Sequence, residues 1–62
     1  MAHLHETYEL YLTLESEESA FEALTCASPV ELVGRVRDIM RERVAKSVEV
    51  QQAGRTLFTM FA

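Results

Sequence analysis

Two histidines and a glutamate early in the sequence have the residue types that bind metal ions. His3, His5 and Glu9 stand at odd positions, and side chains two residues apart share one face of a β-strand. Imidazole and carboxylate groups could bind a divalent transition metal there. Histidines this early in a chain commonly have no ligand, so we expect no metal site.

Cys26 is the only cysteine of the chain, so it has no partner for an internal disulfide. A nucleophilic cysteine needs a nearby base, and both histidines are distant in sequence. We therefore expect Cys26 to act as a small buried apolar group. The sequence has no glycine-rich phosphate loop, no Ser/His/Asp set and no spaced metal-ligand motif. These observations predict a protein that is not an enzyme and holds no cofactor.

Charge is unevenly distributed along the chain. Residues 1–34 contain no lysine or arginine and seven glutamates, whereas residues 35–46 contain five basic and two acidic residues. The two regions could attract each other within the fold or across a dimer, or both could be solvated surfaces.

Arg37 and Arg41 lie four residues apart and could contact successive phosphates. However, the net charge is −4, and no aromatic residue stands between the basic ones. Both facts argue against binding to nucleic acid.

The composition is that of one globular domain covering residues 1–62, with 48% hydrophobic and 26% charged residues. No apolar run approaches the roughly 20 residues that a membrane span needs. The first residues also lack the basic start and apolar stretch of a signal peptide. We expect a cytoplasmic protein that does not associate with membranes.

Residues 3–15 alternate between apolar and polar side chains, which predicts a β-strand with one buried face. Residues 16–28 are ambiguous. Phe21 and Leu24 fit one helical turn after the capping signal of Ser19 and Glu22, but a loop fits equally well.

A second helix start is clearer. Ser28, Pro29 and Glu31 combine an N-cap serine, a proline at the first helical position and a glutamate at the third. The helix is predicted to run from Pro29 to about Ala45. Its apolar residues cover an arc of roughly 180°, wider than a single sheet contact requires. Gly34 is either a tolerated glycine on the polar side or a point of close approach to another backbone.

Residues 47–62 are typical of a β-hairpin that turns at Gln52-Ala53-Gly54. A three-residue loop with a bulge pairs Gln51 with Arg55. A two-residue Ala-Gly turn would shift the register by one residue, and the sequence allows both. In either case Gly54 is expected to have a positive φ.

The last strand is apolar on both faces, which favours a central position in a sheet. We therefore predict an α+β fold of order β-α-β-β, with a three-stranded antiparallel sheet of order 2-3-1 and one helix on one face. The predicted core has six members: Leu10, Leu12, Val33, Val36, Met40 and Val50.

One helix covers only one face of such a sheet, and a chain of this size has a marginal core. The sequence therefore predicts self-association as a homodimer or higher oligomer. The predicted interface residues are Tyr11, Arg37, Arg43, Leu57, Phe58, Met60 and Phe61.

The function indicated is that of a small, non-enzymatic interaction or regulatory protein, which could also bind a larger protein partner. One alternative is an oligomeric carrier in which Tyr11, Phe58 and Met60 from several subunits stack on a flat aromatic ligand. A weaker alternative is nucleic-acid binding through Arg37, Arg41 and Arg43.

Overall fold

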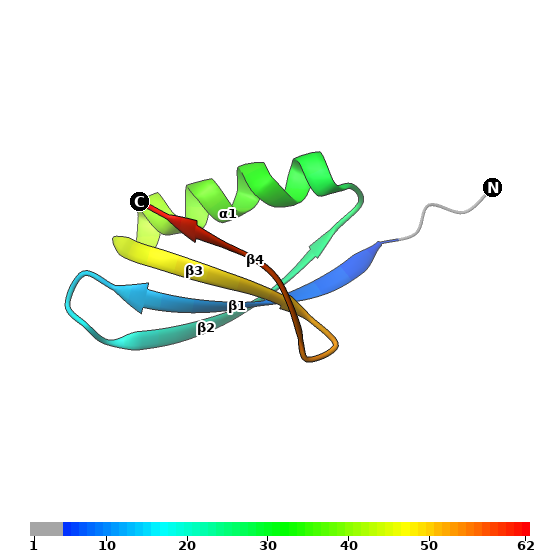
Figure 1. Ribbon diagram of the computed structural model, residues 1–62. Coiled ribbons are helices and arrows are strands. Elements are labelled where there is room, and N and C mark those ends of the chain that lie inside the picture. Colours follow the sequence, from blue (N-terminus) through cyan, green and yellow to red (C-terminus); the bar gives the residue numbers. More distant parts are fainter. Residues whose placement is uncertain (1–4) are drawn as a thin grey trace.

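The computed structural model describes residues 5–62, which form four strands and one helix. The elements are β1 (Glu6–Leu14), β2 (Ser19–Cys26), α1 (Pro29–Arg43), β3 (Ala45–Gln52) and β4 (Arg55–Phe61). The strands form one antiparallel sheet of order β2-β1-β3-β4, and α1 lies across one face of it (Figure 1). The predicted α+β class is confirmed, but the three-stranded sheet of order 2-3-1 is wrong.

The first correction concerns the segment between the first strand and the helix. Residues 19–26 form strand β2, which pairs antiparallel with β1. Leu24 and Cys26 point into the core, whereas Phe21 is exposed. The inward positions also include the small Ala20 and the charged Glu22, so the period-two pattern is weak. The three-residue spacing of Phe21 and Leu24 then imitates a helical turn.

The second correction concerns the last strand, which is at an edge of the sheet and not at its centre. β1 already has β2 on one side and β3 on the other. Both edges of β1 are therefore occupied, and β4 pairs with the outer edge of β3. The apolar residues on both faces of β4 therefore reflect an incompletely covered edge.

The hairpin between β3 and β4 has the tighter of the two turns that the sequence allows. Gln52 pairs with Arg55, which leaves Ala53 and Gly54 as a two-residue turn. Their φ angles are 53° and 80°, and positive values at both positions characterise a type I′ turn. The predicted positive φ of Gly54 is confirmed. A bulge then leaves Leu57 between the pairs Gln51–Thr56 and Val50–Phe58, and this extra residue keeps Phe58 on the same face as Val50.

The helix begins as predicted. Ser28 is the N-cap, and its Oγ accepts a hydrogen bond from the backbone N–H of Glu31 at 3.2 Å. The Glu31 carboxylate accepts one from the N–H of Ala27 at 2.8 Å. The helix ends at Arg43, slightly earlier than expected, because Val44 adopts a left-handed conformation with φ of 53°.

The core lies between α1 and the sheet. Of the six predicted core residues, five are buried, including Leu10, Val36 and Val50 with no exposed surface. Val33 is only half-buried, so its prediction is wrong. A Cβ atom on Gly34 would meet no heavy atom of the described residues within 4 Å, so no backbone approaches it there. Within residues 5–62, no helix has the length and apolar character needed to cross a membrane.

Candidate functional site

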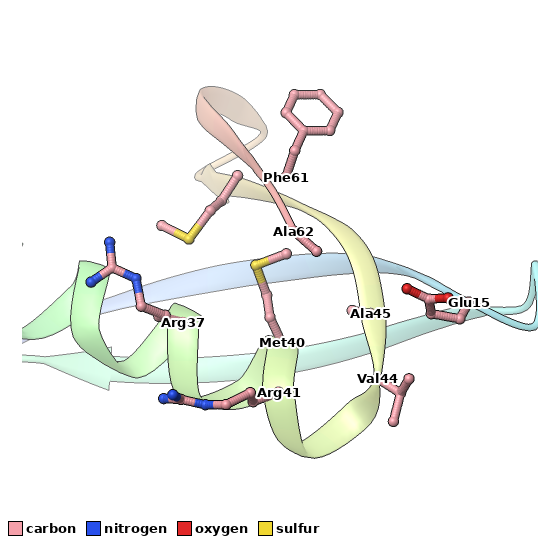
Figure 2. Close-up of a pocket in the computed structure, with 9 residues that line it drawn as sticks. Glu15, Arg37, Met40, Arg41, Val44, Ala45, Phe61 and Ala62 are labelled. Carbon is pink, nitrogen blue, oxygen red and sulfur yellow. The ribbon is translucent and has the colours of Figure 1, made fainter.

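A groove lies between the C-terminal half of α1 and the edge strand β4. Its volume is about 510 Å³. Figure 2 shows its lining residues, with Met40 extending from α1 toward Ala62 at the end of β4 and Arg37 lying nearer the start of the helix. We call it the α1–β4 groove; its main lining residues are Glu15, Arg37, Met40, Arg41, Val44 and Met60.

The groove exists because one helix cannot cover four strands. α1 packs mainly against β3 and β2, and β4 lies beyond them at the edge of the sheet. Phe58 and Met60 point to the helix side of β4 but are only half-buried. The groove is therefore the uncovered part of the hydrophobic core.

The charged side chains at the groove differ in their partners. Arg41 forms an ion pair with Asp38 at 2.7 Å, one turn earlier on α1. Arg37 makes no ion pair with any of residues 5–62. Glu15 is exposed and lies beside the C-terminal end of α1, where its N–H donates to the carbonyl of Val44 at 2.9 Å, far from Arg37 in Figure 2. Among residues 5–62, Arg37 is therefore a cation at an apolar groove with no carboxylate at ion-pair distance.

The free edge of β4 has unpaired backbone groups. The N–H of Ala62 donates to the carbonyl of Lys46 at 3.1 Å, which continues the β3–β4 ladder beyond the Ser47–Phe61 pair. Hydrogen-bonded and non-hydrogen-bonded pairs alternate in an antiparallel ladder. The backbone groups of Phe58 and Met60 therefore face β3, whereas those of Thr59 and Phe61 face outward.

The opposite face of the sheet is polar and hydroxyl-rich. Tyr11 on β1 meets Phe21 on β2 with ring centroids 5.3 Å apart in an edge-to-face arrangement. The hydroxyls of Thr7 and Thr25 lie 3.0 Å apart. Phe58 and Met60 point to the helix side, whereas Phe61 pairs with Ser47 and therefore lies on this open face.

Glu49 also lies on this open face, where it accepts hydrogen bonds from the Thr56 hydroxyl and, at 3.0 Å, from the Gln51 amide. These two bonds, the Thr56 bond first, lower the pKa of Glu49 below its ordinary value. The carboxylate is therefore held in its charged form.

The predicted interface residues fall in three places. Phe58, Met60 and Arg37 lie at or beside the α1–β4 groove, and Tyr11 lies on the open face. The sheet separates Tyr11 from Phe58 and Met60, so one chain does not bring together the predicted ligand-stacking set. Leu57 and Phe61 are exposed on β4, at 44% and 74%, and Phe61 also lines the groove.

Arg43 has a partner within the chain, since its Nη1 lies 2.6 Å from Oε2 of Glu22. The acidic first part and the basic central part of the chain therefore attract each other within the fold at this point. The sequence analysis missed Phe21 as a surface aromatic residue. The available signal was the alternation of Phe21, Ala23 and Thr25 with Leu24 and Cys26.

The structure describes two of the residues that we considered for metal or thiol chemistry, His5 and Cys26. His5 is exposed and His3 lies outside the described residues. Residues 5–62 contain no group of three or more His, Cys, Asp or Glu side chains that could hold a metal ion. Cys26 is buried as predicted, and burial raises the pKa of its thiol, with a smaller contribution from Glu31. The thiolate, the nucleophilic form, is therefore disfavoured.

Comparisons of this chain with protein-family models, with curated proteins and with solved structures find no match. The functional argument therefore depends on the geometry of the chain itself.

Proposed function

We propose that this chain is a small, non-enzymatic interaction protein that forms a homodimer through the edge of β4. The observation that supports this most directly is the state of that edge. The outward backbone groups of Thr59 and Phe61 have no partner within residues 5–62, and the strand beside them is apolar.

The two edge strands of the sheet differ in their charged residues, and this difference favours β4 as the dimer interface. Edge strands of monomeric proteins usually carry charges that oppose pairing with another chain. The β2 edge has Glu22 near its middle, in contact with Arg43. By contrast, β4 has no charged residue after Arg55. A second β4 can therefore pair with it in the antiparallel direction without like-charge repulsion.

Two-fold symmetry is the commonest arrangement of homodimers, and antiparallel β4 strands satisfy it. Such pairing would join two four-stranded sheets into one continuous sheet. It would give partners to the outward N–H and C=O groups of β4 and would cover part of Leu57 and Phe61.

The area available indicates a moderate affinity. A large aromatic side chain buries roughly 150–250 Å², and Phe61 is 74% exposed. With Leu57 and the strand backbone, the β4 edge offers on the order of 500 Å² per protomer, below the roughly 800 Å² of a standard interface. We therefore propose dissociation in the micromolar range.

Nucleic-acid binding has less support, because Arg41 and Arg43 already have carboxylate partners. We also propose a cytoplasmic location, since the single cysteine is buried without a disulfide, as is usual in reducing compartments.

Sedimentation equilibrium on the whole chain tests the dimer. The unmodified chain should show about twice its 7.1 kDa mass, with dissociation on dilution. Thr59→Pro removes an outward N–H of β4 without breaking a β3–β4 hydrogen bond, and it should give a monomer.

Ala23→Pro is the matched control on the other edge. The N–H of Leu14 donates to the carbonyl of Glu18 at 2.8 Å, so by the same alternation the N–H of Ala23 points away from β1. This variant should remain a dimer. A single species near 7 kDa up to about 100 μM, or a dimer lost only in Ala23→Pro, would contradict the proposal.

A further inference from the structure

We propose that the α1–β4 groove binds an elongated apolar molecule with an anionic head, such as a medium-chain carboxylate, and that Arg37 holds the head. The groove is complete within one chain, so the proposal does not depend on the homodimer.

The body of the ligand would occupy the apolar part of the groove. The volume of about 510 Å³ falls within the range of small-molecule sites. Met40 extends into the groove from α1, and Met60 lines it on β4. Methionine side chains are flexible and polarisable, so they adapt to apolar ligands of different shapes.

Arg37 would bind the anionic head of the ligand. Within residues 5–62 it has no carboxylate partner, whereas Arg41, one turn further along α1, is paired with Asp38. A guanidinium can donate two parallel hydrogen bonds to a carboxylate, and such charge-assisted bonds are stronger beside apolar surface than in water. Arg37 is therefore available for an external anion.

The other charge at the groove fixes the direction of the ligand. Glu15 is exposed and lies on the far side of the groove from Arg37 in Figure 2. Its carboxylate would repel an anionic head. The head is therefore expected beside Arg37, with the tail passing between Met40 and Met60.

Ligand binding and dimer formation share Phe61, which lines the groove, but otherwise use different parts of β4. Pairing involves the outward backbone groups of the strand, whereas the groove lies on its helix side. α1 packs over β3 and β2, so in a dimer two adjacent β4 strands, about 5 Å apart, would separate the two helices. Two neighbouring grooves would then stay open.

Methyl NMR of the methionines provides the test, with sodium decanoate below its micelle concentration as the probe. We expect saturable shifts of the Met40 and Met60 methyl signals. Decyltrimethylammonium, which has the same tail and the opposite charge, should bind at least about tenfold more weakly.

Two arginine variants distinguish a specific contact between Arg37 and the ligand from a general effect of positive charge on the helix. Arg37→Gln should weaken decanoate binding about tenfold or more. Arg35→Gln makes the same change of charge on the same helix but outside the groove, and its effect should be less than about twofold. The proposal is overturned by unsaturable shifts, by equal binding of both probes, or by equal effects of the two variants.

The mass of the same samples distinguishes this proposal from the dimer. A monomer that binds decanoate through Arg37 would contradict only the homodimer. A dimer with no saturable binding would contradict only the ligand site.

Discussion

Arg43, in the last turn of α1, donates a hydrogen bond from Nη1 to Oε2 of Glu22 on β2, across 2.6 Å. The two residues are 21 positions apart in the chain, and the contact joins the helix to the edge of the sheet that lies opposite β4. The end of α1 therefore has a contact with the β2 side of the sheet. The groove lies on the other side of the helix, where β4 is not covered by α1.

A double-mutant cycle with Arg43→Gln and Glu22→Gln should give a coupling of about 0.5 kcal/mol in the free energy of unfolding. The value is small because the two side chains are 41% and 32% exposed, and exposed pairs are screened by water and salt. Urea unfolding at low and high salt measures it. Asp38 and Arg41, at 57% and 72% exposure, serve as the control pair. A larger coupling for that pair would contradict the prediction.

The sequence predicts the first strand and the helix correctly because the pattern of each element is sufficient without information about its neighbours in the fold. Leu10 and Leu12 alternate with polar residues, and Ser28 with Glu31 caps the helix whatever surrounds it. The core residues of both elements follow directly from these periods. Val33 is the exception, since it is only half-buried and lines a second pocket on α1, beside Val30 and Arg37.

The position of β4 could not be predicted in the same way. Phe58 and Met60 point to the helix side, as in a core strand, and Phe61 adds an apolar group elsewhere on the strand. Only the pairing of β2 with β1 excludes β4 from the centre, and that pairing depends on the ambiguous residues 16–28. The groove results from the edge position of β4, so it could not be predicted from the sequence either. Of its lining residues, Arg37, Met60 and Phe61 were among the predicted interface set.

Leu12→Ala should lower the free energy of unfolding by about 2–5 kcal/mol, because it leaves a cavity between the sheet and α1. Leu12 is only 2% exposed. Leu57→Ala removes the same atoms from a side chain that is 44% exposed, and it should cost less than about 1 kcal/mol under conditions where the chain is monomeric. Urea unfolding compares the two. An unchanged midpoint for Leu12→Ala would contradict the position of β1.

The geometry of the β3–β4 turn predicts that substitutions at Ala53 and Gly54 change the stability of the chain in opposite directions. Ala53 has a positive φ of 53°, which asparagine tolerates better than alanine, so Ala53→Asn should stabilise the chain by about 0.5 kcal/mol. Gly54, with φ of 80°, should lose about 1–3 kcal/mol on replacement by valine. Thermal unfolding measures both changes. A destabilising Ala53→Asn together with a neutral Gly54→Val would mean that the turn lies elsewhere.

The hydrogen bonds of Glu49 should make part of the stability depend on pH. The pKa of Glu49 is lowered in the folded chain, first by the Thr56 hydroxyl and then by the Gln51 amide. A lowered folded pKa stabilises the chain above the unfolded value, about 4.3 for glutamate. This contribution is lost as the pH falls from there through the folded pKa.

Thr56→Val removes the larger of these two causes and should bring the pKa of Glu49 closer to its ordinary value. The variant should therefore be less stable than the unmodified chain at pH 7, and the difference should shrink as the pH falls below about 4.3. Urea unfolding across this range, with an NMR titration of the Glu49 carboxyl, measures both effects. Thr59→Val is the matched control, since Thr59 pairs with Glu49 across β3 and β4 but does not hydrogen-bond its carboxylate. If both variants keep the pH profile of the unmodified chain, the Thr56 hydroxyl does not hold the Glu49 carboxylate in its charged form.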